Sequence, residues 1–181
     1  MDISVVSDAS PLIYFAKLNA LELVARVLGP VGVPPAAYRE AVITGQEQGF
    51  PDAKRIATAI EQGWLKRLSL ESSEKALAEQ LQANSRLGPG EAETIACAVH
   101  RSLKALLHDR KARKVAAAHG VSTWQPADVL FLALLRRHTT WPVFQDLLRR
   151  LAIVSGMGAA TYLEREALAA EIAVQLGLKE V

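Results

Sequence analysis

The chain has 181 residues, of which half are apolar and 22% are charged, and its formal net charge is +2. This length and composition predict one globular domain with a buried core and exclude an intrinsically disordered protein. The longest apolar run, residues 129–135, is too short to span a membrane, and the sequence opens without a basic and apolar leader. Cys97 is the single cysteine, so no internal disulfide can form, and we expect a cytoplasmic protein.

Short apolar strands alternate with longer helices along the sequence. The predicted strands, in chain order, are residues 3–7, 29–33, 64–68, 105–107 and 121–124. The predicted helices, in chain order, are residues 12–28 with a break near Asn19, 35–43, 51–62, 72–84, 91–103, 110–119, 127–138, 143–151 and 159–176. This alternation predicts an α/β fold whose mainly parallel sheet is covered by helices on both faces.

The segment 155–158, Ser-Gly-Met-Gly, is typical of a flexible joint and precedes a final amphipathic helix. We therefore expect a main domain over residues 1–150 and a C-terminal helical extension over residues 151–181. The extension either packs on its own domain or docks a second subunit or a partner protein.

Two aspartates follow predicted strands directly. Asp8 closes the first strand, and Asp109 comes just after the strand at residues 105–107. The carboxyl ends of parallel strands lie at the edge where open α/β proteins bind ligands, so we expect both side chains there. The alternative is that each aspartate caps the helix that follows it.

Two glutamates share the apolar side of their helices. Glu91 lies on the same side as Ile95, whereas Glu93 is predicted to face away. Glu40 lies on the same side as Ala36, Ala37 and Ile43. A lone carboxylate on an apolar face is costly unless it is paired or binds a metal. The alternatives are a favourable helix dipole for Glu91 and pairing with Lys or Arg for Glu40.

Four carboxylates that converge on one cleft would repel one another without a cation. Such a set of hard oxygen ligands suits Mg²⁺ or Mn²⁺, and no Cys/His pattern typical of zinc is present. The four histidines, His100, His108, His119 and His138, show no ligand-like spacing and are interpreted as surface or core residues.

In order, these motifs resemble those of PIN-domain proteins. They are VVSDASPL at residues 5–12, VP at 33–34 leading to Glu40, GEAETIA at 90–96 and LLHD at 106–109, and the likeness covers about residues 1–150. More narrowly, the sequence is similar to the VapC-type ribonuclease toxins of bacterial toxin–antitoxin pairs, and to a subgroup known mostly as nucleic-acid-binding proteins. The resemblance implies a three-layer α/β/α sandwich and a ribonuclease that cuts single-stranded RNA with Mg²⁺ or Mn²⁺.

By position, the resemblance implies that Asp8, Glu40, Glu91 and Asp109 are the catalytic, metal-binding acids. It also implies a cognate antitoxin as a partner, and a homodimer is a further expectation. The sequence departs from the toxin pattern twice, because Glu91 stands where the toxins more often have Asp and no further acid closely follows Asp109. Glu93 in place of Glu91 stays open.

Positive charge is concentrated in residues 101–150, which carry ten Lys or Arg and three Asp. Arg110, Lys111, Arg113 and Lys114 directly follow Asp109, and we expect them to bind the RNA backbone, unless they form an ordinary solvated helix face. Two other functions fit the sequence. One is a PIN-like interaction or regulatory protein with little catalytic activity; the other is a phosphotransfer enzyme with Asp8 as its nucleophile.

Overall fold

The structure, a computed structural model, describes residues 2–179. Its five strands are β1 (Val5–Ser7), β2 (Val31–Val33), β3 (Leu65–Arg67), β4 (Lys104–Leu106) and β5 (Thr123–Trp124). They form one sheet in the order β3-β2-β1-β4-β5, and every neighbouring pair is parallel. All five strands predicted from the sequence are present. They could be predicted because short apolar runs bounded by turn residues are typical of buried parallel strands.

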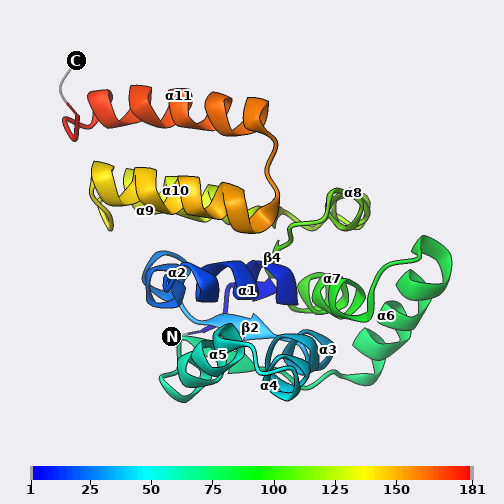
Figure 1. The fold of residues 1–181 in the computed structure, drawn as a ribbon. Helices are drawn as coiled ribbons and strands as arrows, with labels where there is room; N and C mark the ends of the chain where they lie inside the picture. Colours follow the sequence, from blue (N-terminus) through cyan, green and yellow to red (C-terminus); the bar gives the residue numbers. More distant parts are fainter. Residues whose placement is uncertain (1, 180–181) are drawn as a thin grey trace.

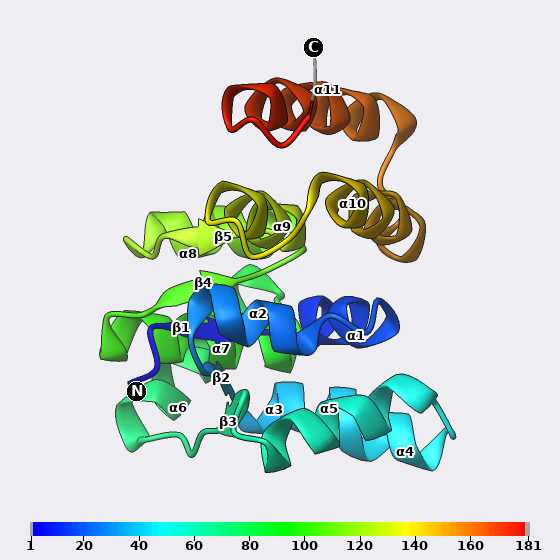
Figure 2. The ribbon, with the colours of Figure 1, turned by 90° about the vertical axis from the view of Figure 1, so that its left-hand side faces the viewer.

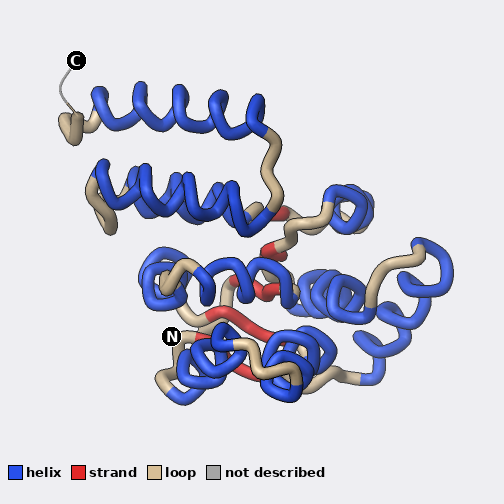
Figure 3. Tube along the Cα trace, viewed as in Figure 1, coloured by secondary structure: helices blue, strands red, loops and turns tan. Residues whose placement is uncertain are grey.

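Helices connect the strands and lie on both sides of the sheet (Figures 1 and 3). In chain order they are α1 (Ala9–Lys17), α2 (Leu21–Leu28), α3 (Pro35–Tyr38), the π-helix η1 (Arg39–Thr44), α4 (Gly45–Glu47), α5 (Pro51–Glu61), α6 (Ser72–Ser85), α7 (Pro89–Arg101), α8 (Arg110–Ala118), α9 (Pro126–Leu135), α10 (Trp141–Ser155) and α11 (Ala159–Gln175). The α/β/α sandwich expected from the sequence is confirmed. None of the helices within residues 2–179 is long and apolar enough to cross a membrane.

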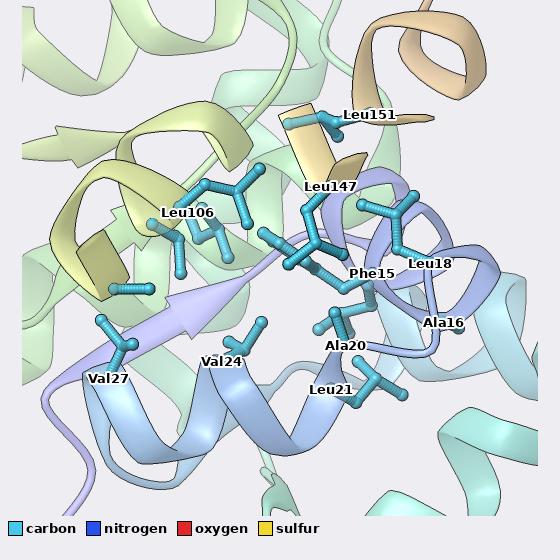
Figure 4. Packing of buried hydrophobic residues seen from close by; sticks show 14 of the residues in the cluster. Phe15, Ala16, Leu18, Ala20, Leu21, Val24, Val27, Leu106, Leu147 and Leu151 are labelled. Carbon is cyan, nitrogen blue, oxygen red and sulfur yellow. The ribbon is translucent and has the colours of Figure 1, made fainter. Parts of the chain in front are cut away.

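Two apolar clusters lie on opposite faces of the sheet. Val5 and Leu106 belong to the first cluster, which packs against α1, α2, α9 and α10, and which Figure 4 shows around Phe15 and Leu147. Val6 and Ala105 belong to the second, which packs against α6, α7 and α8. The alternation of neighbouring strand residues between the faces follows from the two-residue repeat of a β-strand.

Cys97 lies fully buried in the second cluster. Burial, with a contribution from the charge of Glu74, raises the pKa of its thiol to about 12. The side chain is therefore part of the core between α7 and the sheet, and it carries no charge near neutral pH.

The C-terminal helix α11 is the outermost layer and lies over α9 and α10, away from the sheet (Figures 1 and 2). Ala169 and Ala173 bury its inner side in the first cluster, whereas Leu163 and Leu168 are exposed. The domain boundary expected after residue 150 falls inside α10. Met1 of the expected main domain and residues 180–181 of the expected extension lie outside the described residues.

Several helix boundaries differ from those predicted. Helix α7 begins at Pro89 rather than Glu91, because proline fits the first helical position, where no N–H group is needed. Helix α10 is longer than predicted and includes Trp141, which stacks on Phe144 in the core. The break between α1 and α2 falls at Asn19, as predicted, and this residue adopts a left-handed conformation with φ of 56°.

Candidate functional site

Asp8 leaves the carboxyl end of β1 at the N-cap position of α1, and it is 7% exposed. Its carboxylate makes no capping hydrogen bond, although the N–H groups of Ala9 and Ser10 favour its charged form. Burial and the negative charges of Glu40 and Glu91 outweigh them and raise the pKa of Asp8 to about 6. The charges of three of the predicted acids therefore act on one another.

Glu40 lies in the π-helix η1, which follows β2 through α3. The side chain is exposed, yet partial desolvation and the charge of Glu91 raise its pKa. Of the residues predicted to share the apolar side of Glu40, Ala36 and Ala37 are buried, whereas Ile43 is 42% exposed. The wider π-helical turn changes the angles that a regular helix would give.

Glu91 and Glu93 occupy the first two turns of α7, and each carboxylate accepts a backbone hydrogen bond. Glu91 Oε2 accepts from Gly88 N at 3.0 Å and so closes the start of its own helix. Glu93 Oε2 accepts from Ala36 N at 2.7 Å, at the start of α3. The expectation that Glu93 faces away was wrong, because α3, distant in the sequence, packs against that side of α7.

Gly90 brings the start of α7 against Asp8. A Cβ atom at this position would lie 2.5 Å from Asp8 Oδ1 and 3.7 Å from the backbone of Ala37. A side chain at position 90 would therefore displace the Asp8 carboxylate, whereas 3.7 Å to Ala37 is an ordinary van der Waals contact.

Asp109 lies at the N-cap of α8, where its Oδ1 accepts a hydrogen bond from Ala112 N at 2.8 Å. The side chain is exposed, and its charge favours the protonated forms of His108 and Arg113. Asp109 thus performs the capping role that was its alternative interpretation. Within residues 2–179, no three His, Cys, Asp or Glu side chains are gathered closely enough to hold a metal ion.

Two neighbours of Asp8 have no distinctive signal in the sequence. Burial, with a contribution from the charge of Asp8, raises the pKa of Tyr14, and the Tyr14 ring packs edge-to-face on His108 with 5.1 Å between ring centroids. Burial lowers the pKa of His108, and the charge of Arg113 adds to this. Tyr14 and His108 are thus next to the acidic residues, although 94 positions of sequence separate them.

The four basic residues after Asp109 divide into two groups. Arg110, Lys111 and Lys114 are exposed, and Lys111 Nζ donates to Arg86 O at 3.3 Å. Arg113 instead is half-buried and lines a cavity. The prediction of one solvated or RNA-facing stripe therefore describes three of these side chains, and Arg113 has a different environment.

The family model described as DUF3368, a PIN domain, matches residues 4–171. The chain belongs to this PIN-domain family. Its structure is similar to the crystal structure of PAE2754 from Pyrobaculum aerophilum, with a TM-score of 0.52 and 16% identity over 74% of this chain and 98% of that one. No curated protein matches the chain. The PIN domain is a nuclease-type fold, and its members are typically nucleases that usually bind divalent metals.

The acidic residues fit a divalent cation in their chemistry. Carboxylate oxygens are the ligands that Mg²⁺ and Mn²⁺ prefer. Burial and repulsion raise the pKa of Asp8, and a bound cation would offset both by stabilising the charged carboxylate. Asp8, Glu40 and Glu91, whose charges act on one another, are residues that would hold it. Glu91 and Asp109 each have one carboxylate oxygen engaged at the start of a helix.

Proposed function

We propose that this PIN domain is a divalent-metal-dependent ribonuclease that cleaves single-stranded RNA. The observation that carries the proposal is the buried Asp8, whose carboxylate faces the charges of Glu40 and Glu91 at the carboxyl end of the central strand. A buried carboxylate repelled by two further acids has no structural benefit by itself, which supports a role in binding a cation.

The proposed ligands are Asp8, Glu40, Glu91 and Asp109, and the cation is Mg²⁺ or Mn²⁺. When bound, the cation supplies Lewis-acid stabilisation of phosphate charge and lowers the pKa of a bound water. Burial keeps water away from Asp8, so its charge acts at low local dielectric. The exposed side chains Arg110, Lys111 and Lys114 would hold the RNA backbone.

The role of a toxin with a cognate antitoxin belongs to the same proposal and rests on the resemblance to VapC-type proteins. The exposed Leu163 and Leu168 on α11 support a protein partner or a second copy of the chain. A PIN-like domain that binds nucleic acid without cutting it is the second candidate. It is favoured by the capping bond of Asp109 and by the absence, within residues 2–179, of side chains gathered to hold a metal ion.

Conservative substitutions test the proposal, because each preserves the structural role of the residue. Asp8→Asn keeps the side-chain shape, Glu91→Gln keeps an acceptor for Gly88 N, and Asp109→Asn keeps a good N-cap. Each of these variants, and Glu40→Gln, should cut single-stranded RNA at least ~100-fold more slowly in Mg²⁺, equivalent to about 2.7 kcal/mol in the barrier.

Glu93→Gln is the matched control, because the Glu93 carboxylate contacts the start of α3. This variant should cleave RNA at close to the parental rate. Circular dichroism of every variant separates lost chemistry from lost folding. Cleavage by Asp8→Asn at the parental rate would assign the activity to another site or to a contaminant. RNA binding without metal-dependent cutting would instead support the non-catalytic candidate.

A further inference from the structure

A cavity of about 230 Å³ lies between α8, the start of α9 and the turn from α10 to α11. Polar and charged side chains line much of it: His108, Arg113, Gln125, Ser155, Thr161 and Arg165. The proposed metal ligands Asp8, Glu40, Glu91 and Asp109 are not among its lining residues. The cavity is therefore a second polar feature of the molecule, separate from the acidic residues.

Two arginines give the cavity a positive charge. Arg113 and Arg165 are both half-buried, and burial together with the charge of Arg165 lowers the pKa of Arg113, against the opposing charge of Asp128. Asp128 Oδ2 accepts a hydrogen bond from Gln125 N at 2.7 Å, so this acid already has a role at the start of α9. Arg165 Nη2 donates to Gln125 Oε1 at 3.3 Å, an uncharged partner.

Two residues that line the cavity carry buried polar atoms without hydrogen-bond partners. Arg113 Nη1 and Ser155 Oγ are buried and have no hydrogen-bond partner among the described residues. A buried, unpaired guanidinium donor costs free energy, and an acceptor from outside the chain, such as water or an anion, would offset that cost.

The N-terminus of α11 adds backbone donors to the same cavity. This helix is 17 residues long, and its N-cap residue, Gly158, provides no side-chain cap. Gly158 and Thr161 both line the cavity, and there is open space where a Cβ of Gly158 would lie. An uncapped helix start presents free N–H groups and a partial positive charge, both of which favour an anion.

The size and position of the cavity indicate which kind of anion fits it. It is smaller than the roughly 300–1,000 Å³ of typical small-molecule sites, so it suits a phosphate group rather than a whole nucleotide. His108 lines the cavity and packs on Tyr14, and the charge of Asp8 contributes to the raised pKa of Tyr14. The cavity is thus connected to the acidic residues through one pair of aromatic rings.

We propose that this cavity binds a phosphate group through Arg113, Arg165 and the start of α11. The assignment of this phosphate rests on the proposed ribonuclease function. It is a phosphate of the RNA backbone, next to the phosphate that is held at the acidic residues. Arginine presents paired donors that match phosphate oxygens, and the half-burial of Arg113 and Arg165 distinguishes this site from the exposed Arg110, Lys111 and Lys114 of α8. The cavity would then fix the position of the strand rather than take part in the chemistry.

Inorganic phosphate tests the anion site without RNA or metal. In EDTA and at constant ionic strength, phosphate should raise the melting temperature of the parent more than chloride does, and calorimetry should give the affinity. Arg113→Gln and Arg165→Gln should each weaken phosphate binding about tenfold or more. The control is Arg149→Gln, which removes the same charge from an exposed position on α10 and should bind phosphate like the parent.

Stability without phosphate separates binding from a structural role. Because Arg113 Nη1 is unpaired, Arg113→Gln should be at least as stable as the parent in chloride. A parent that phosphate does not stabilise beyond chloride would overturn the site. Equal weakening of phosphate binding by Arg149→Gln would also overturn it, since general surface charge would then explain the effect.

RNA binding by Asp8→Asn tests the source of the phosphate without any need for cleavage. Single-stranded RNA with one uncharged methylphosphonate, moved along the strand, is followed by fluorescence anisotropy. A methylphosphonate at one position of the RNA should weaken binding about tenfold. When Arg113→Gln is added to Asp8→Asn, the methylphosphonate at that position should no longer weaken binding, and its effects at the other positions should not change. Phosphate binding with no such position would uphold the anion site and overturn its assignment to RNA.

Discussion

At the scale of single residues, Asp8 bears the largest electrostatic cost of the candidate site. Asp8 lies at the N-cap position of α1 without a capping hydrogen bond, although the N–H groups of Ala9 and Ser10 favour its charged form. It is buried beside two other acids, which raises its pKa to about 6. Its structural alternative therefore accounts for its position in the chain and not for its environment.

The raised pKa of Asp8 predicts how stability depends on pH. The folded state favours the protonated acid, so the penalty is absent below about pH 4, grows between pH 4 and 6, and is complete above pH 6, at about 3 kcal/mol. In EDTA, Asp8→Asn should be more stable than the parent. This advantage should increase by roughly 1–1.5 kcal/mol between pH 5 and pH 7.5 in urea unfolding. An advantage that is constant over this range would mean that Asp8 titrates normally.

Gly90 allows the site to be disturbed without disturbing the fold. Gly90 is the second residue of α7, and the Cβ of an alanine there would lie 2.5 Å from Asp8 Oδ1. Gly90→Ala should stay folded, displace the Asp8 carboxylate and lose most of its Mg²⁺-dependent RNA cleavage. Gly88→Ala is the control, since its Cβ would meet Glu91 Oε2 at an ordinary 3.6 Å. Equal cleavage by the two variants would contradict the proposed role of Asp8.

At the scale of elements, α7 joins the acidic residues to a buried ion pair. Its first turns carry Glu91 and Glu93, and its last residue, Arg101, binds Glu74 of α6 with two bonds of 2.6 and 2.7 Å. Glu74 is 1% exposed and also accepts from Glu71 N. The charged hydrogen bonds from Arg101 lower the pKa of Glu74. This pair fixes the position of α6 against the far end of α7.

Breaking that pair should destabilise the fold. Arg101→Gln would leave Glu74 as a buried, uncompensated carboxylate, at a cost of about 3 kcal/mol in the free energy of unfolding. Urea unfolding at pH 7 measures the change. Replacing both residues, as Arg101→Gln with Glu74→Gln, should recover part of the loss, because the buried charge is then gone. A double variant no more stable than Arg101→Gln would argue against the charge as the cause.

At the scale of the whole molecule, the sheet separates two apolar clusters, and Asp8 after β1 interacts through its charge with Glu40 of η1 and Glu91 of α7. Metal binding at that point should stabilise the entire domain. If the dissociation constant is near ~1 mM, ~10 mM Mg²⁺ adds about 1.4 kcal/mol. This corresponds to roughly 3–6 °C in melting temperature for a domain of this size. Asp8→Asn should lose the shift, and its absence from the metal-free parent with Mg²⁺, Mn²⁺ and Ca²⁺ alike would contradict a metal site.

The sequence was sufficient for features set by local pattern. The five strands, the order of helices and the break at Asn19 follow from apolar periodicity and turn residues, which act over a few positions. The family was also accessible, because its motifs occur in order along the chain. The capping role of Asp109 was one of the two interpretations that its position allowed.

Features that depend on packing between distant segments could not be predicted. Glu93 contacts Ala36 across 57 positions of sequence, and a helical wheel of α7 alone cannot show where α3 lies. The π-helical turn at Glu40 leaves no composition signal and changes which side chains share a face. Arg113 resembles its basic neighbours in the sequence, and only the approach of α11 makes it part of a cavity.

The burial of Cys97 determines how the protein responds to oxidants and alkylating reagents. Thiolates react and thiols do not, so a group with a pKa of about 12 in the core stays inert while the domain is closed. Modification requires α7 to separate from the sheet and expose the sulfur atom to solvent. The rate at which Cys97 is labelled therefore measures how often α7, which also carries Glu91, separates from the sheet.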